Sequence, residues 1–181
     1  DREKLSVRQN IMVARVIETG LPLIYLNMVG GQDDQVFDGG SFVLNPGGAL
    51  AVQLPLFEDT VAHIDLLRGP EGWRAEDGPK ARIPDMLEQD YHAMVLGVRD
   101  YLRKSGFAKV LLGLSGGIDS AIVATIAADA IGAENVRCVM LPSDYTSESS
   151  LQDAKAVAEN LGCAYDFVPI TEGQVAITGT L

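Results

Sequence analysis

The chain combines two kinds of apolar pattern. Over residues 5–19 the apolar residues fall near helical spacing, and the pattern ends at Gly20, which suits a helix C-cap. Short apolar runs separated by turn residues then predict strands at 23–29, 41–44, 49–54 and 60–66. The first third of the chain is therefore expected to form one helix followed by a β meander.

The remainder of the chain alternates between helix and strand patterns. Between about Leu67 and Pro84, turn residues without an apolar period predict a linker. A helix is expected from about Asp85 to Ser105. Strands at 110–114, 136–141 and 165–170 then alternate with helices at 119–131 and 147–161. Continuous apolar strands in this order predict an α/β fold with a parallel sheet covered by helices on both faces.

Composition and charge narrow the classes of protein. The chain is 47% hydrophobic, as in a packed globular protein, and its net charge is −11. So few basic residues argue against a broad nucleic-acid-binding or anionic-membrane surface, although one nucleotide could still bind locally. The two cysteines, Cys138 and Cys163, form no metal-binding pattern and are expected to be reduced. No apolar run is long enough to span a membrane, which predicts a cytoplasmic protein.

The ends of the chain have features of an internal fragment. Asp1 opens directly into a helical pattern without an initiator Met, and the chain stops at Leu181 with little to complete a domain. We therefore expect the sequence to be part of a longer protein.

The strongest chemical signal is the sequence Ser-Gly-Gly-Ile-Asp-Ser at residues 115–120, between a predicted strand and a predicted helix. Gly116 and Gly117 would allow backbone N–H groups to approach phosphate oxygens closely. The helix N-terminus favours anions, and the Asp119 carboxylate suits a magnesium ion. The loop lacks the Lys of a Walker A motif and does not match GxGxxG.

Residues 115–120 carry the signature of the ATP-pyrophosphatase (PP-loop) superfamily, which this chain resembles. The resemblance implies binding of ATP and Mg²⁺, cleavage of ATP between its α and β phosphates, and a loop that holds the departing pyrophosphate. Asp119 is the expected metal ligand. The expected nucleotide-binding residues are Gly113, Leu114, Ser115, Gly116, Gly117, Ile118, Asp119, Ser120 and Leu141.

The segments that flank the loop resemble NAD synthetases. The resemblance is carried by residues 91–107 before the loop and by residues 141–154 after it. It implies that the main chain near Leu141 contacts the adenine. The resemblance also implies that residues 143–150 border the nucleotide. Read from the residues alone, Ser143, Thr146 and Ser147 could equally be helix-capping residues.

The first part of the chain resembles the closing part of a nitrilase-type glutamine amidohydrolase domain. The similar segments are 20–27, 29–33 and 37–41. The resemblance places the glutaminase Cys, Glu and Lys before residue 1, so no catalytic residue is expected in this chain. Lys4 and Arg8 match a Lys-x-x-x-Arg pattern of that family, which makes Lys4 either a contact of glutamine or an exposed helix lysine. Residues 27–38 are expected to form loop structure near the amidase site or a subunit interface.

Together the resemblances predict a glutamine-dependent NAD synthetase organised as a nitrilase-like part (1–68), a linker (69–84) and a PP-loop part (85–181). The implied substrates are nicotinic acid adenine dinucleotide (deamido-NAD), ATP and glutamine or ammonia, in a homo-oligomer without nucleic-acid or membrane partners. The alternatives are another PP-loop amidotransferase, similar to GMP synthetases, a tRNA sulfur-transfer enzyme, or a non-catalytic nucleotide-binding module. The acidic composition and the absence of a Cys pair argue against the tRNA enzyme.

Overall fold

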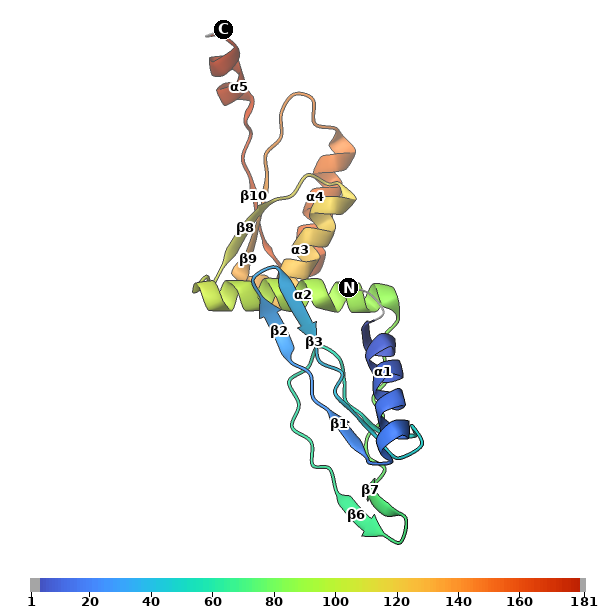
Figure 1. The fold of residues 1–181 in the computed structure, drawn as a ribbon. Helices are drawn as coiled ribbons and strands as arrows, with labels where there is room; N and C mark the ends of the chain where they lie inside the picture. The colour runs from blue at the N-terminus through green and yellow to red at the C-terminus, as the bar shows by residue number, and fades with distance from the viewer. Residues whose placement is uncertain (1–3, 180–181) are drawn as a thin grey trace. The chain divides into compact units, whose positions relative to one another are not determined.

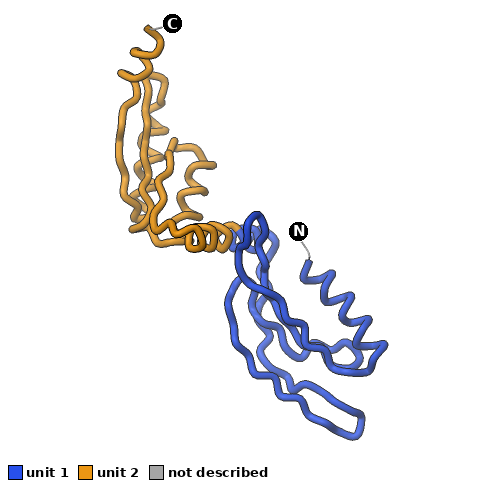
Figure 2. Tube along the Cα trace, turned by 60° about the vertical axis from the view of Figure 1, so that its left-hand side comes forward, with its two compact units in different colours: residues 1–93 blue, residues 94–181 orange. Residues whose placement is uncertain are grey.

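A computed structural model describes residues 4–179 of the chain, which divide into two compact units. One unit covers residues 1–93 and the other residues 94–181 (Figure 2). The division falls within helix α2 (Met86–Ser105). Each unit is described by itself.

The first unit is built on one helix and a three-stranded antiparallel sheet. Helix α1 (Lys4–Thr19) precedes strands β1 (Leu23–Tyr25), β4 (Phe42–Leu44) and β5 (Leu50–Gln53), and the strands lie in the order β1-β4-β5. The helix ends where predicted, because Gly20 has a positive φ of 67° and its N–H donates to the Val16 carbonyl. Buried Val16 packs with Phe42 and Leu44, so the apolar stripe of α1 covers this sheet.

Two hairpins complete the first unit (Figure 1). Strands β2 (Val29–Gln32) and β3 (Gln35–Asp38) form one, and β6 (Leu66–Gly69) and β7 (Gly72–Ala75) form the other. The second hairpin is attached through Asn45, whose side chain accepts from the Ala75 N–H at 2.7 Å and donates to the Ala75 carbonyl at 2.9 Å.

The structure corrects three expectations for this unit. The predicted strand at 23–29 ends at Tyr25. Beyond it, Leu26 is 85% exposed, and Asn27 donates hydrogen bonds to Ser41, Asp38 and Gly39. The predicted strand at 60–66 is also wrong, since no strand forms between 60 and 65. Regular structure begins instead at Leu66, the last residue of that predicted strand, and continues into the segment expected to be a linker, because residues 66–69 pair with 72–75.

The second unit has the predicted order of strands and helices. After α2 come β8 (Val110–Gly113), α3 (Ile118–Ile131), a short 3₁₀ turn (Ala133–Asn135), β9 (Val136–Met140), α4 (Glu148–Leu161), β10 (Ala164–Phe167) and α5 (Thr171–Thr178). The strands form a parallel sheet in the order β10-β9-β8. The parallel α/β arrangement is therefore confirmed, while the 3₁₀ turn and α5 were not predicted.

The core of this unit lies on one face of the sheet. Cys138 and Met140 of β9 pack there with small residues of α3 and α4, including Ala124 and Ala154. Both helices lie on the same face in Figure 1. On the opposite face Leu111 is 69% exposed, so among residues 4–179 the helices α3 and α4 cover one face of the sheet.

Candidate nucleotide-binding site

The candidate site begins where β8 leaves the sheet. Leu114 is buried, and its N–H donates to the Val139 carbonyl at 2.9 Å, which extends the ladder one residue beyond the strand. The chain then turns through Ser115, Gly116 and Gly117 into α3. Eight predicted nucleotide-binding residues, 113–120, thus form one strand–loop–helix connection at the carboxyl end of a parallel strand, where open α/β sheets bind ligands.

Gly116 is required at its position for two independent reasons. Its φ is +80°, a left-handed conformation that disfavours any residue with a Cβ. In addition, a Cβ at this position would lie 2.3 Å from the carbonyl oxygen and 2.8 Å from the Cα of Ser150. Because both of those atoms belong to the backbone, no side-chain rotation could relieve the clash. The loop is therefore packed closely against the first turn of α4.

Two serine hydroxyls stabilise the same loop from within. The Ser115 and Ser120 hydroxyl oxygens lie 3.0 Å apart, and the Ser115 N–H donates to the Ser120 hydroxyl at 3.2 Å. The Ser120 hydroxyl also donates to the Gly117 carbonyl at 3.0 Å. These contacts connect the two ends of the glycine turn, so the loop has a defined shape before any ligand binds.

The N-terminus of α3 is suited to an anion. Gly117 is its N-cap residue, and no side chain caps the N–H groups of its first turn among the described residues. The uncapped N–H groups and the helix dipole favour a phosphate there. Asp119 lies exposed in the same turn, and Gly117 would contact only the Ser115 hydroxyl if it carried a Cβ. The position of Gly117 is therefore open enough for a ligand to approach the backbone.

Leu141 lies at the same edge of the sheet as this loop. It directly follows β9, which pairs in parallel with β8, and it is 49% exposed. The segment after it leads into α4, where Ser147 has the capping role that the sequence allowed: it is the N-cap of α4 and accepts from the Ser150 N–H at 3.2 Å. Thr146 has a related local role, because its hydroxyl accepts from the Ser143 N–H.

A magnesium site at Asp119 would have to form with the nucleotide. No group of three or more His, Cys, Asp or Glu side chains suited to a metal occurs among residues 4–179. Magnesium in nucleotide sites is commonly held by one or two carboxylates together with phosphate oxygens and water. A single exposed carboxylate beside an anion-binding helix end fits that donor set.

The remaining predicted contact, Lys4, lies in the other unit. Lys4 is in the first turn of α1 and lines a pocket of about 1030 Å³ together with Arg8, Asn27, Asp38 and Phe57. Asn27 and Asp38 received no chemical role from the sequence, and residues 29–38, expected to be loop, form the β2–β3 hairpin instead. Asn27, a polar residue inside the apolar run 23–29, was the signal that could have indicated this cluster.

Neither cysteine has the environment of a reactive thiol. Burial raises the pKa of the Cys138 thiol to about 11 and also raises the pKa of Cys163. A raised pKa keeps both thiols protonated at neutral pH. Both cysteines pack in the apolar core around β9.

These features are typical of a class of α/β domains in which a glycine-containing loop and a helix N-terminus at the edge of a parallel sheet bind phosphate groups. Comparison with known proteins gives the family. Residues 90–181, slightly more than half of the chain, match the NAD synthase family, and residues 5–69 match the carbon-nitrogen hydrolase family. The chain belongs to the NAD synthase family.

Individual relatives agree with this assignment. The chain is 62% identical over 180 residues to a protein of Rhodobacter capsulatus and 44% identical over 171 residues to one of Synechocystis sp., both named glutamine-dependent NAD(+) synthetase. These matches cover 99% and 92% of this chain but 33% and 30% of the relatives. The chain therefore spans about a third of the length of the curated relatives that it matches.

A solved structure is similar along the whole chain. The glutamine-dependent NAD+ synthetase from Acinetobacter baumannii, solved in complex with ADP, superposes with a TM-score of 0.93 at 37% identity over 100% of this chain and 34% of its own. The enzyme from Cytophaga hutchinsonii, at 16% identity, shares the fold with a TM-score of 0.79 over 98% of this chain and 35% of its own. No helix among residues 4–179 has the length and apolar character needed to cross a membrane.

Proposed function

We propose that this chain is a segment of a glutamine-dependent NAD synthetase and that residues 113–120 bind the phosphates of its ATP. The observation that carries the proposal is Gly116, whose positive φ and close approach to the Ser150 backbone shape the loop at the sheet edge. Membership of the NAD synthase family and the carbon-nitrogen hydrolase match support this reaction over that of another PP-loop amidotransferase or a binding module.

In the proposed reaction, ATP activates a carboxylate. The carboxylate of deamido-NAD attacks the α phosphorus of ATP, which forms an acyl adenylate and releases pyrophosphate. Ammonia derived from glutamine then attacks the acyl carbon, so a C–N bond forms and the C–O bond to AMP breaks. The products are NAD, AMP and pyrophosphate.

The protein's contribution in this segment is positional and electrostatic. The backbone N–H groups around Gly116 and Gly117 and the α3 N-terminus stabilise the negative charge that develops on the departing pyrophosphate. Gly113, Leu114 and Ile118 shape the loop as its flanking residues, the Ser115 and Ser120 hydroxyls add donors, and the main chain at Leu141 contacts the adenine.

Asp119 would hold the magnesium ion. When bound, the ion neutralises charge on the phosphate oxygens of ATP. The exposed carboxylate in the first turn of α3 supplies one ligand.

In this proposal, the unit of residues 1–93 contributes to binding of glutamine, the nitrogen donor. Lys4 contacts glutamine from the pocket that it lines. Residues 1–68 belong to the glutaminase part, 69–84 to the connection and 85–181 to the synthetase part, in a cytoplasmic homo-oligomer.

The test uses the full-length protein with deamido-NAD and ATP-magnesium, supplied with either glutamine or ammonium. NAD should form with both nitrogen sources. Asp119→Asn should abolish NAD formation with both while glutamine hydrolysis continues, and Asp129→Asn, which changes an exposed acid later in α3, should leave both activities intact. The proposed function would be rejected if the wild-type protein formed no NAD with glutamine, or formed none with ammonium.

A further inference from the structure

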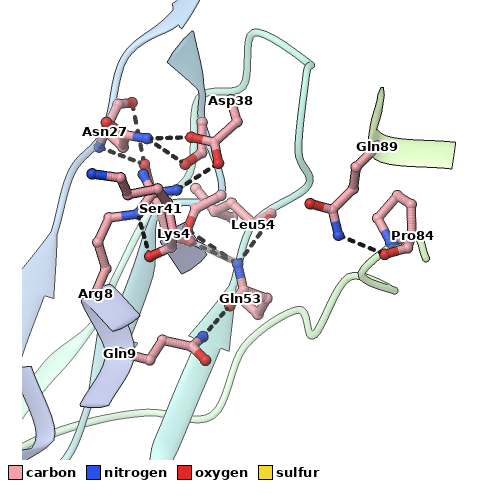
Figure 3. Close-up of polar contacts among 12 residues, drawn as sticks. Lys4, Arg8, Gln9, Asn27, Asp38, Ser41, Gln53, Leu54, Pro84 and Gln89 are labelled. Carbon is pink, nitrogen blue, oxygen red and sulfur yellow. Dashed lines mark hydrogen bonds and ion pairs between the residues drawn. The ribbon is translucent and has the colours of Figure 1, made fainter. Parts of the chain in front are cut away.

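A chain of polar contacts connects the first turn of α1 to the turn that follows β3 (Figure 3). Arg8 lies one helical turn after Lys4, and its Nη2 donates to Asp38 Oδ2 at 2.5 Å. Its Nε donates to the Lys4 carbonyl oxygen at 3.2 Å. The Arg8 and Asp38 side chains are only 15% and 26% exposed, so this ion pair is less screened by water than a surface pair.

Asp38 is held by a second partner on its other oxygen. Asp38 Oδ1 accepts from Asn27 Nδ2 at 2.9 Å, and the same nitrogen donates to the Gly39 carbonyl at 2.8 Å. The backbone N–H of Asn27 donates to the Ser41 hydroxyl at 3.0 Å. Asn27 therefore holds one carboxylate oxygen of Asp38 while Arg8 holds the other, and the two contacts together fix the Asp38 side chain in place.

The backbone next to Asp38 is also restricted. Gly39 and Gly40 both have positive φ, 68° and 64°. A Cβ at Gly39 would lie 2.6 Å from Val29 Cγ2, and one at Gly40 would lie 2.7 Å from Leu56 Cδ2. The turn after β3 is thus closely packed, and it provides a firm support to which the helix attaches.

A neighbouring residue attaches the same part of α1 to the sheet. Gln9 Nε2 donates to Gln53 Oε1 at 2.8 Å, and Gln53 is 2% exposed. The Gln53 Nε2 in turn donates to the Leu54 carbonyl at 2.9 Å. Further along the helix, Arg15 instead pairs with Glu18 of the same helix, and both side chains are more than half exposed. The attachment is therefore built into the end of α1 that carries Lys4.

We propose that Arg8 and Asp38 are positioning residues for the nitrogen-donor site. Their ion pair fixes the first turn of α1, and with it Lys4, at the pocket that all three residues line. Asp38 also neutralises Arg8, so that the guanidinium does not compete with Lys4 for the carboxylate of an amino acid. This inference rests on the proposed function, in which Lys4 contacts glutamine.

The experiment measures steady-state NAD formation by the full-length protein with glutamine or with ammonium. Arg8→Gln and Asp38→Asn are each expected to raise the KM for glutamine on the order of tenfold, because loss of one charge-assisted hydrogen bond weakens binding by about that factor. The kcat and the ammonium-supported rate should stay within about twofold, because the pair does not touch the synthetase chemistry. Arg15→Gln, the matched control on the same helix, should change neither.

A second comparison tests whether Arg8 acts through Lys4. Lys4→Met alone and Lys4→Met combined with Arg8→Gln should show the same KM for glutamine, and Arg8→Lys should recover part of the loss. The inference is overturned if either single variant, Arg8→Gln or Asp38→Asn, leaves the glutamine KM unchanged. It is equally overturned if the ammonium rate falls in parallel or if the effects of Lys4→Met and Arg8→Gln add. Wild-type protein that forms no NAD with ammonium would instead reject the proposed function.

Discussion

Replacement of Gly116 by Ala tests most directly the geometry of the loop at residues 115–117, for which phosphate binding is proposed. The left-handed φ of +80° would cost alanine about 1–2 kcal/mol. The new Cβ would also lie 2.3 Å from the Ser150 carbonyl oxygen, so the loop or the first turn of α4 must move. Forcing a methyl group into a packed contact adds about 1–3 kcal/mol, for a total of about 2–5 kcal/mol.

Gly106 provides the matched control. Its φ is +76°, and among the described residues no atom beyond Gly106 and its two chain neighbours lies within 4 Å of the position that its Cβ would take. Gly106→Ala should therefore show the conformational cost alone, about 1–2 kcal/mol. Comparison of the two variants separates the close approach to Ser150 from the cost of the backbone conformation.

The assay is urea unfolding of the full-length variants, together with calorimetric titration of ADP. Gly116→Ala should be less stable than Gly106→Ala and should lose ADP affinity, whereas Gly106→Ala should bind ADP as the wild type does. A stability difference between the two below about 1 kcal/mol, or unchanged ADP binding by Gly116→Ala, would refute the reasoning.

Three further predictions concern stability. Asn45→Ala should lower the free energy of unfolding by about 1–3 kcal/mol for each backbone group of Ala75 that it leaves unpaired, whereas Asn10→Ala on the exposed side of α1 should have little effect in urea titrations. Asp85→Ala removes the side chain that caps α2 and should cost about 1 kcal/mol by the same measurement. Burial raises the pKa of Cys138 from 9.0 to about 11. The stability contributed by the protonated, buried thiol should therefore be present below pH 9.0 and be lost as the pH rises towards 11. Cys138→Ala should reduce this loss.

The second unit was largely predictable because its signals are local. The run Val110–Leu114, the glycines after it and the small apolar residues of α3 each favour the structure that they form. The contact between Gly116 and Ser150 could not be predicted, because it depends on how α4 packs and Ser150 carries no sequence signal for a backbone contact. Helix α5 was missed because its eight residues show no apolar pattern at helical spacing; in the structure, none of them is buried.

The first unit was less predictable because its strands depend on tertiary partners. The apolar alternation near Val61 favours a strand, yet Val61 is 92% exposed and has no paired strand. Regular pairing instead forms in residues 66–75, whose turn-rich sequence favours a linker. Asn27 and Asp38 looked like loop residues, whereas their side chains connect α1 to the turn after β3.

The contact between Gly116 and the Ser150 backbone also limits where the chain can tolerate insertions. Residues 141–149 run from the end of β9 to the point of contact, so a longer or shorter connection there would move the Ser150 carbonyl away from Gly116 or into it. The Ser150 side chain can vary without this effect, because the contact uses main-chain atoms. Length variation among relatives is therefore expected to concentrate elsewhere, for example in the β6–β7 turn, where Gly69 and Gly72 have open space around them.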